Sequence, residues 1–567
     1  MTSKLSKGRI LARAAFSLGL SCGTATFAFA QSDRPNIVVI VADDLGYSDL
    51  SAFGGEIPTP NLDSLAGSGV QLTNFHVAPT CSPTRAMLLT GTDNHTAGVG
   101  NMAEEMLPDQ RGKKGYDGYL NHDVVALPAL LRDAGYHTAM AGKWHLGVEE
   151  DQRPGARGFE TSFALLNGGA HHFDQTGMVS KAPKATYTRD DKPVDLPSDF
   201  YTSDSFTDEI IGAIGSTPAG KPFFAYLSYT APHWPLQAPD EDIARFRGKY
   251  DAGYDAIQQA RLKRMTELGL VPEGVQANRS PLWPRWEELD AEQRAHEARR
   301  MEVYAAMVSR VDQNVGRLVN ALKEAKAFDN TVFVFLSDNG AEGQLPEDIM
   351  GGKDSWWIEE NFDNSLDNLG RRSSYFGYGP NWAAVSQTPF RMNKGYTYEG
   401  GTRSPAFVTY PGWRNGEKAD AFLQVKDVAP TLLELAGVTA PSVYNGKAVA
   451  PIEGTSMLDW LQGKAAAVHA DTKAVCTELF GRVAIWKGDW KLAFSNSPWG
   501  TGDWELFNLR RDPAEASDQS GQEVGKLAEL KTDWDDCQAR HLIFWNTGLS
   551  ANMVYTNKDF YLFRPER

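Results

Sequence analysis

Cysteine is scarce in this chain, with four among 567 residues. So few cysteines exclude a small scaffold held together by many disulfides. Long apolar runs are lacking as well, because the apolar segment near the N-terminus is too short to span a bilayer. Internal repeats and low-complexity tracts are also missing, which argues against a solenoid. What remains is a globular composition, with 42% hydrophobic and 23% charged residues.

Net positive charge is missing too. The formal charge is −16 at pH 7, and the first 30 residues contribute basic groups but no acids. An acidic surface repels nucleic acids and anionic lipids, so we expect neither as a partner. An anionic substrate would therefore need local positive groups inside a cleft.

The first 30 residues have the pattern of a secretory signal peptide. Basic residues between Lys4 and Arg13 precede the short apolar segment Ala14–Leu20, and Ala28-Phe29-Ala30 forms an A-x-A cleavage site. The sequence predicts removal of residues 1–30 and a periplasmic or secreted protein without membrane insertion. A membrane anchor, a disordered arm and lipoprotein processing at Cys22 are the alternatives.

Three cysteines remain after that cleavage: Cys81, Cys476 and Cys537. An exported protein permits a disulfide between the last two. Alternatively, Cys537 is a buried thiol, because it shares a predicted helical face with Leu530 and Trp534. The sequence leaves both possibilities open.

Three continuous apolar runs predict strands that are covered on both faces, as in a parallel sheet. They span residues 36–42, 223–229 and 331–337. Amphipathic helical patterns lie between them, at 303–322 and at 123–134. In the second, Pro128 would lie near the start of the helix or kink it. This alternation predicts a doubly wound α/β domain.

From about residue 470 the pattern changes to short strands, which Gly, Asp and Asn turns connect. We expect these strands at 475–479, 483–486, 490–494 and 504–507, followed by a helix at about 526–539. The pattern predicts a smaller α+β domain with an antiparallel sheet, so we place the catalytic domain at 31–465 and the second domain at 466–567. The aromatic C-terminal stretch is too apolar for a solvated tail, and it should pack on this subunit or in a homo-oligomer.

Oxygen-bearing side chains follow two of the predicted strands. Asp43 and Asp44 come after the first, and Asp338 and Asn339 after the last. Ligands gather outside the carboxyl ends of strands in α/β sheets, and hard cations such as Ca²⁺ and Mg²⁺ prefer carboxylate and amide oxygens. Either pair alone could simply cap a turn. Together they predict a metal site, because acids crowded without a cation would repel one another.

The segment Cys81-Ser82-Pro83-Thr84-Arg85 carries the most specific signal, and it continues as Met87-Leu88-Leu89-Thr90-Gly91. Its companions are Asp43-Asp44, Lys143-Trp144-His145, His233, Asp338-Asn339 and Lys394. In this order, these motifs resemble the type I sulfatases, and in particular the bacterial arylsulfatases. The resemblance covers nearly all of the mature chain.

This resemblance implies an alkaline-phosphatase-like fold with a mixed sheet, and one calcium ion bound by Asp43, Asp44, Asp338, Asn339 and residue 81. In that family a formylglycine-generating enzyme oxidises the cysteine to formylglycine. One hydroxyl of the hydrated aldehyde attacks sulfur and expels the alcohol. Loss of the second hydroxyl's proton then releases sulfate and regenerates the aldehyde, which a serine could not do.

The resemblance also implies roles for the basic residues. Arg85 lies one helical turn from the nucleophile and should reach its side chain. Lys143 would contact the sulfate, and His145, on the same side of an extended segment, would help to remove the diol proton. His233 and Lys394 would bind the bridging oxygen and protonate or stabilise the leaving group.

Two features leave alternatives open. Cys81 precedes a helical segment, Pro83–Leu89, whose N-terminus favours negative charge, so an unmodified thiolate nucleophile is a rival to formylglycine. The long aromatic segment Gln344–Phe390 could line an apolar mouth for aryl esters, pack as a flap, or form an oligomer contact.

The sequence as a whole predicts a calcium-dependent, formylglycine-based arylsulfatase that hydrolyses a small sulfate monoester to a phenol or alcohol and sulfate. A phosphonate monoester hydrolase or phosphodiesterase on the same scaffold is the alternative, because sulfur and phosphorus oxyanions share tetrahedral geometry. If Cys81 is never oxidised, a metal-stabilised binding module for sulfated compounds is a third possibility.

Overall fold

The computed structural model describes residues 34–279, 284–346, 355–497 and 499–545. The predicted signal peptide, and the tail aromatics from Tyr555 onward, lie outside these residues. Among the helices of the described ranges, none combines the length and hydrophobicity that crossing a bilayer requires.

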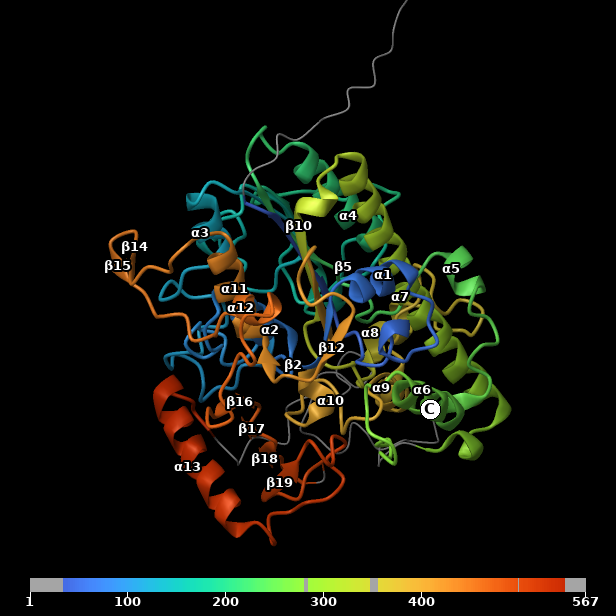
Figure 1. Cartoon of the computed structure of the whole chain (residues 1–567). Helices are drawn as coiled ribbons and strands as arrows, with labels where there is room; N and C mark the ends of the chain where they lie inside the picture. The colour runs from blue at the N-terminus through green and yellow to red at the C-terminus, as the bar shows by residue number, and fades with distance from the viewer. Residues whose placement is uncertain (1–33, 280–283, 347–354, 498, 546–567) are drawn as a thin grey trace, which may run out of the picture.

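An eleven-stranded mixed sheet forms the centre of the molecule (Figure 1). Its parallel middle strands are, in spatial order, β10 (Thr331–Ser337), β1 (Asn36–Ala42), β9 (Phe223–Ser228), β3 (His137–Lys143) and β4 (Thr161–Leu165). The flanking strands are β11 (Arg403–Thr409), β2 (Val70–His76), β12 (Glu417–Ala419) and β13 (Leu423–Gln424) on one side, and β7 (Tyr187–Arg189) and β8 (Lys192–Pro193) on the other. The three apolar runs of the sequence are therefore neighbouring strands, which confirms the predicted α/β fold.

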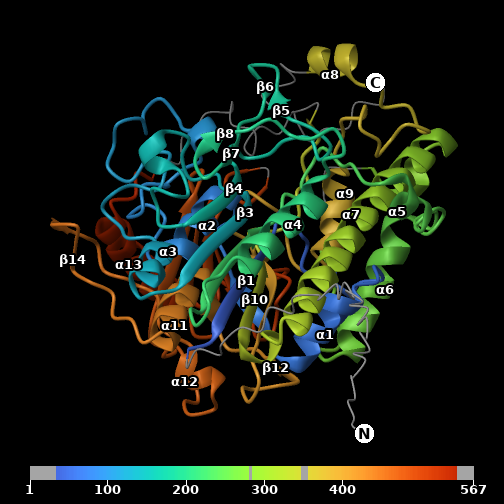
Figure 2. The ribbon, with the colours of Figure 1, turned by 90° about the horizontal axis from the view of Figure 1, so that it is seen from above.

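Helices cover both faces of this sheet, as Figure 2 shows from above. One face carries α4 (Thr202–Gly215) and α7 (Ala291–Glu324), and the other carries α2 (Cys81–Thr90), α3 (Leu127–Asp133) and α11 (Val428–Leu435). Val38 and Ile40 of β1 belong to the first core, whereas Val39 and Val41 belong to the second. Because both faces are buried, the strand is apolar at every position rather than at alternate positions.

The two predicted helices exist, but their bounds differ from the prediction. The helix expected at 303–322 begins earlier, at Ala291, where the side chain of Asp290 accepts a hydrogen bond from the backbone N–H of Gln293. The helix expected from Asp123 begins only at Leu127, so that start was wrong. Pro128 lies in the first turn, where its missing N–H removes no helical hydrogen bond, and this fits a helix that begins next to it.

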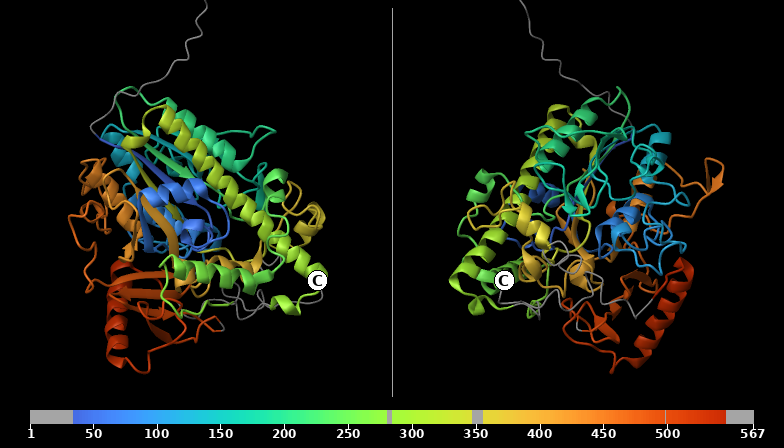
Figure 3. Two further views of the ribbon diagram at one scale, coloured as in Figure 1. Left: turned by 45° about the vertical axis from the view of Figure 1, so that its right-hand side comes forward. Right: turned by 180° about the vertical axis from the view of Figure 1, so that it is seen from behind.

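A second, four-stranded antiparallel sheet lies against one end of the first, in red in Figure 3. Its strands are β16 (Val475–Leu479), β17 (Arg482–Lys487), β18 (Trp490–Phe494) and β19 (Trp504–Asn508), and α13 (Val524–His541) packs on it. This arrangement confirms the smaller α+β unit with an antiparallel sheet. The exact domain boundary at 465/466 stays a prediction.

The C-terminal helix is tied to this second sheet by a disulfide. Cys476 of β16 is bonded to Cys537 of α13, which is one of the two possibilities that the sequence left open. At the end of the described tail, the ring of Trp545 packs against Trp504 and Trp534. This part of the aromatic tail therefore packs on its own subunit.

The remaining α-helices and short strands complete the described ranges. The helices are α1 (Pro60–Ser68), α5 (Asp240–Ala244), α6 (Gly253–Glu267), α8 (Ser355–Asn361), α9 (Gly379–Ser386), α10 (Glu399–Thr402) and α12 (Leu458–Leu461). The short strands are β5 (Thr176–Val179) paired with β6 (Ala182–Lys184), and β14 (Val443–Tyr444) paired with β15 (Lys447–Ala448).

Candidate active site

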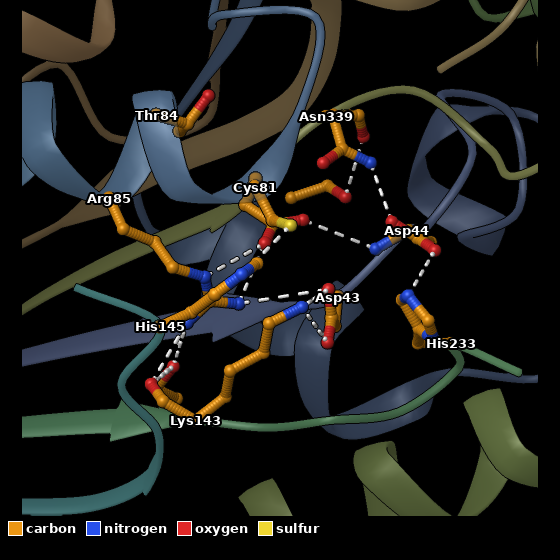
Figure 4. A network of polar contacts seen from close by, with 12 residues as sticks. Asp43, Asp44, Cys81, Thr84, Arg85, Lys143, His145, His233 and Asn339 are labelled. Carbon is orange, nitrogen blue, oxygen red and sulfur yellow. Dashed lines mark hydrogen bonds and ion pairs between the residues drawn. The ribbon is translucent and has the colours of Figure 1, made fainter. Parts of the chain in front are cut away.

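The predicted metal ligands meet at the carboxyl ends of β1 and β10. The register of these parallel strands pairs Ala42 with Ser337, so the residues that follow emerge side by side (Figure 4). The backbone N–H of Asp338 donates to the carbonyl of Ala42 at 3.1 Å, and that of Asp44 donates to Asp338 Oδ1 at 3.2 Å. The two turns thus hold each other in place across nearly 300 residues of sequence.

The donor set at this point fits a hard divalent cation. Asp43, Asp44, Asp338 and Asn339 are each at most 1% exposed. Ligand atoms of Asp43, Asp338 and Cys81 lie within 4.8 Å of one another. The Oδ1 atom of Asn339 is buried and accepts no hydrogen bond from the described residues. Carboxylate oxygens beside an amide oxygen that lacks a donor are the chemistry that Ca²⁺ or Mg²⁺ requires.

Basic side chains surround these acids. Lys143 Nζ lies 2.8 Å from both carboxylate oxygens of Asp43. Lys394 Nζ lies 2.9 Å from the carboxylate of Asp44. On the same carboxylate, Oδ2 is 3.4 Å from His233 Nε2. The structure therefore brings together the metal ligands and cations that the sequence placed in one site.

Arg85 does not make the contact that its helical spacing suggested. Its Nε and Nη2 atoms donate to Asp338 Oδ2 at 3.0 and 2.6 Å, and its Nη1 donates to the carbonyl of Lys143 at 3.1 Å. No hydrogen bond from Arg85 to the Cys81 sulfur occurs within the described ranges. A fully buried guanidinium needs a carboxylate partner, and Asp338 provides it.

Burial and neighbouring charges shift the pKa values of Asp43 and Asp44 in opposite directions. Burial raises the pKa of Asp43 well above its ordinary value, and the charges of Asp338 and Asp44 add to this effect, which outweighs the opposing charge of Lys143. For Asp44 burial acts in the same direction, but the charges of Lys394 and His233 prevail and lower its pKa to about 2. A bound divalent cation would favour the ionised form of both carboxyls.

Cys81 occupies the first turn of α2. The helix begins at Cys81 itself, two residues earlier than the sequence indicated, after the extended residue Thr80. Its sulfur is buried and lies 3.3 Å from His145 Nδ1. Although burial raises it, the pKa of the thiol falls to about 7 because of the positive charges of Lys143 and His145. The position thus favours an anionic or nucleophilic side chain.

Lys143 and His145 reach the site by a sharp turn rather than along an extended segment. β3 ends at Lys143, and His145 has a φ of 54°, so the prediction that both side chains share one side of a strand was wrong. Gly142 allows this geometry, because a Cβ there would lie 1.7 Å from the carbonyl oxygen of Ser228. The close approach of β3 to β9 directs Lys143 to the metal ligands and His145 to Cys81.

Sequence reasoning missed three residues of the site. Glu104 Oε1 lies 2.9 Å from His145 Nε2, and Glu342 Oε2 lies 3.1 Å from Lys394 Nζ. The hydroxyl of Ser228 donates to the carbonyl of Lys143 at 2.8 Å. Ser228 ends the apolar run of β9, so the argument that identified the acids after β1 and β10 applies to it as well. Glu104 comes from the short helix η2 (Ala103–Glu105), for which the sequence has no signal.

The contact with Glu104 determines the charge of His145. Burial lowers the pKa of the imidazole, but the charges of Glu104 and of the Cys81 thiolate raise it to about 9. With unmodified Cys81, His145 is therefore protonated near neutral pH, and its ring is held between the nucleophile position and Glu104.

A cavity of about 700 Å³ opens in front of Cys81. Its floor contains the polar residues His145, His233 and Lys394. Its walls are largely apolar and include Met102, Leu166, Met178, Val179 and Trp234. The cavity is large enough for a small organic ester.

The aromatic segment after Gln344 mainly packs behind this wall. Trp357 and Tyr375 are buried, with ring centroids 5.6 Å apart, and Tyr375 lies 6.0 Å from Trp234 of the cavity. Gln344 itself lines the cavity. Of the three possibilities for this segment, the described residues support a packing role, while Trp356 remains half exposed.

Comparison with known proteins agrees with this geometry. A sequence model described as sulfatase matches residues 35–438. An arylsulfatase of Klebsiella aerogenes is 42% identical over 433 residues, which are 76% of this chain and 92% of that protein. The chain belongs to the sulfatase family. It is a type I sulfatase of the alkaline phosphatase superfamily, as its motifs indicated, and it is a sulfuric ester hydrolase.

Further comparisons include the C-terminal part of the chain. An uncharacterised sulfatase of Schizosaccharomyces pombe is 44% identical over 522 residues, covering 89% of this chain and 93% of that protein. A second sequence model, described as N-sulphoglucosamine sulphohydrolase, C-terminal, matches residues 390–534. The crystal structure of Ps i-CgsB in complex with k-i-k-neocarrahexaose has a TM-score of 0.64 and 26% identity, covering 89% of this chain and 92% of that one.

Proposed function

We propose that this sulfatase is an arylsulfatase, which hydrolyses aryl sulfate monoesters to a phenol and sulfate. One observation carries the proposal: Cys81, His145, His233 and Lys394 line the floor of a cavity whose walls are mostly apolar, and the predicted metal ligands contact these residues from behind. The floor suits a sulfate group, and the walls suit an aromatic ring.

The chemistry at the floor requires a nucleophile and positive charge. A hydrated formylglycine at position 81 would supply the oxygen nucleophile, and a calcium ion held by Asp43, Asp44, Asp338 and Asn339 would supply charge for the sulfate oxygens. When the imidazole is neutral, with its proton on Nε2 toward Glu104, His145 Nδ1 lies 3.3 Å from the residue 81 side chain and is placed to take a proton from it. Glu104 holds the opposite nitrogen of that ring, so the imidazole keeps its orientation.

The leaving group would lie on the side of Asp44. His233 and Lys394 both contact that carboxylate, at 3.4 and 2.9 Å. Burial lowers the pKa of His233 well below its ordinary value, and this effect exceeds the opposing charge of Asp44. Lys394 is therefore the group that brings positive charge to the departing oxygen. The neutral His233 ring would help to position that oxygen.

Maturation and location belong to the same proposal. A formylglycine-generating enzyme would act on the Cys81 motif, which carries its proline and arginine at positions 83 and 85. Export to the periplasm or the medium would follow from residues 1–30. Association into a homo-oligomer remains a prediction from the aromatic C-terminus.

Mass spectrometry of the tryptic peptide that ends at Arg85 tests the nucleophile. We expect the mass of an aldehyde instead of a thiol at residue 81 in enzyme that hydrolyses 4-nitrophenyl sulfate. Cys81→Ala should abolish this turnover while circular dichroism shows an unchanged fold. Fully active enzyme that retains the thiol, or substantial activity in Cys81→Ala, would contradict the proposed mechanism.

Phosphonate monoester or phosphodiester hydrolysis is the second candidate, because the same cations can bind tetrahedral phosphorus oxyanions. The rates for 4-nitrophenyl sulfate and for the matching phosphodiester and phosphonate separate the two. The proposal requires the sulfate to have the highest kcat/KM. If the phosphodiester is hydrolysed fastest, the second candidate replaces it.

A further inference from the structure

The mouth of the cavity differs in charge from its floor. Basic side chains are concentrated at the floor, where Lys394 is 2% and His145 is 9% exposed. Around the mouth, acidic side chains of the described residues outnumber basic ones: Glu104, Glu105, Asp117 and Glu149 line it, whereas Lys181 is the basic residue there. A sulfate ester must therefore bring its anion past an acidic and apolar entrance to reach the cations.

Glu105 is the most informative of these acids. Glu104 beside it is occupied by His145, at 2.9 Å, which compensates its charge. By contrast, no ion pair or hydrogen bond of the Glu105 carboxylate occurs within the described ranges. Burial and the neighbouring charge of Glu104 together raise the pKa of Glu105 to about 7. Its carboxyl is thus about half ionised near pH 7 and mostly negative at higher pH, and no cation of the described residues pairs with it.

The charge of Glu105 acts on the alcohol part of the ester, which would remain in the mouth of the cavity while the sulfate group reaches the floor. A single sulfate on an uncharged ring would place its anion on the floor and its ring against Met102, Met178 and Trp234. A second sulfate or a carboxylate on the same molecule would remain near Glu105, in surroundings of reduced polarity. Like charges brought together in such surroundings disfavour binding strongly.

We propose that this cavity selects sulfate esters whose alcohol part carries no second negative charge, and that Glu105 is a residue that determines this specificity. The inference rests on the proposed function, because it assumes that the cavity binds a sulfate ester. It identifies the substrate class as monosulfated, apolar or cationic phenols, and it excludes polyanionic sugars.

Three phenyl sulfates of similar leaving-group acidity test the inference. They are the sulfate esters of 4-ethylphenol, of tyramine and of 3-(4-hydroxyphenyl)propanoic acid, which carry a neutral, a positive and a negative substituent. The values of kcat/KM are compared at about pH 8, where Glu105 is mostly ionised. We expect the anionic ester to be slower than the other two by roughly tenfold or more, as one unfavourable charge contact of moderate strength predicts.

Two variants connect this preference to Glu105. Glu105→Gln should reduce the ratio between the neutral and the anionic ester to about threefold or less, and Glu105→Lys should bring the anionic ester ahead of the cationic one. The exposed Glu273, which does not line the cavity, provides the matched control. Glu273→Gln should leave the ratio unchanged.

The outcomes distinguish the inference from the function on which it rests. Equal kcat/KM for the neutral and anionic esters, or a ratio that neither Glu105 variant alters, overturns the charge selectivity alone. Absence of turnover for all three esters, in enzyme whose residue 81 has the aldehyde mass, contradicts the arylsulfatase proposal itself. The expected ordering, together with its loss in Glu105→Gln, supports the inference.

Discussion

Replacing His95 tests a buried charge contact between the two sheets. His95 follows α2, and its Nδ1 lies 3.1 Å from Asp93 while its Nε2 lies 3.1 Å from Glu478 of β16. All three side chains are at most 4% exposed. Tyr116 faces the ring at 5.5 Å, and His541 of α13 lies 3.8 Å from Asp93. We predict that His95→Gln destabilises the protein strongly below about pH 7 and much less at alkaline pH.

The magnitude follows from the pKa of the imidazole. Burial lowers it, but the hydrogen bonds and charges of Asp93 and Glu478 raise the pKa of His95 from 6.5 to about 9. Such a difference corresponds to about 3 kcal/mol of the free energy of unfolding. Because the folded pKa is the higher one, this stabilisation is complete below about pH 6.5 and is lost as the pH rises through about 9.

Urea unfolding of the wild type and His95→Gln, followed by tryptophan fluorescence at about pH 6.5 and about pH 9.5, measures this difference. The control is His122→Gln, because His122 pairs with Asp151 at 3.0 Å but the two side chains are 45% and 69% exposed. We expect the control to cost less than about 1 kcal/mol at either pH. If His95→Gln costs the same free energy at both pH values, the ion-pair argument is wrong.

Three further predictions concern the site and the contact between the sheets. Chelation should abolish turnover of 4-nitrophenyl sulfate and added Ca²⁺ should restore it, since the carboxyl and amide oxygens around Asp44 form a donor set for a hard divalent cation; full activity after thorough chelation would refute this. Lys394→Met should lower kcat about 100-fold with the fold intact, because it removes positive charge near the leaving oxygen; a change in KM alone would contradict that role. Glu399→Gln should lower the free energy of unfolding in urea by about 3 kcal/mol, because buried His76 loses its carboxylate partner at 3.0 Å and buried Lys491 loses one of the two that it has among the described residues, at 2.9 Å, and keeps only Glu515; an unchanged urea midpoint would exclude it.

Much of the fold could be predicted because its strands are buried on both faces. The runs of β1, β9 and β10 carry apolar residues at consecutive rather than alternate positions, and the residues at or after their ends carry the chemistry. The same logic would have found Ser228 at the end of β9. Glu104 escaped prediction, because it lies in the three-residue helix η2, for which the sequence has no signal, and acts only through its contact with His145. The turn at His145 also escaped, because a left-handed φ at a residue other than glycine has no reliable sequence signal.

The sequence by itself determined three neighbouring strands of the central sheet, the nucleophile motif at Cys81 and the set of oxygen donors and cations that serve it. These properties are local, since hydrophobic periodicity and motif spacing extend over a few residues. Only the tertiary structure decided which charges pair. Arg85 binds Asp338, 253 residues away, because the spatial order of β1, β9 and β10 brings the end of β10 to α2. Only the tertiary structure forms the apolar cavity and its acidic mouth, because their lining residues come from distant parts of the chain.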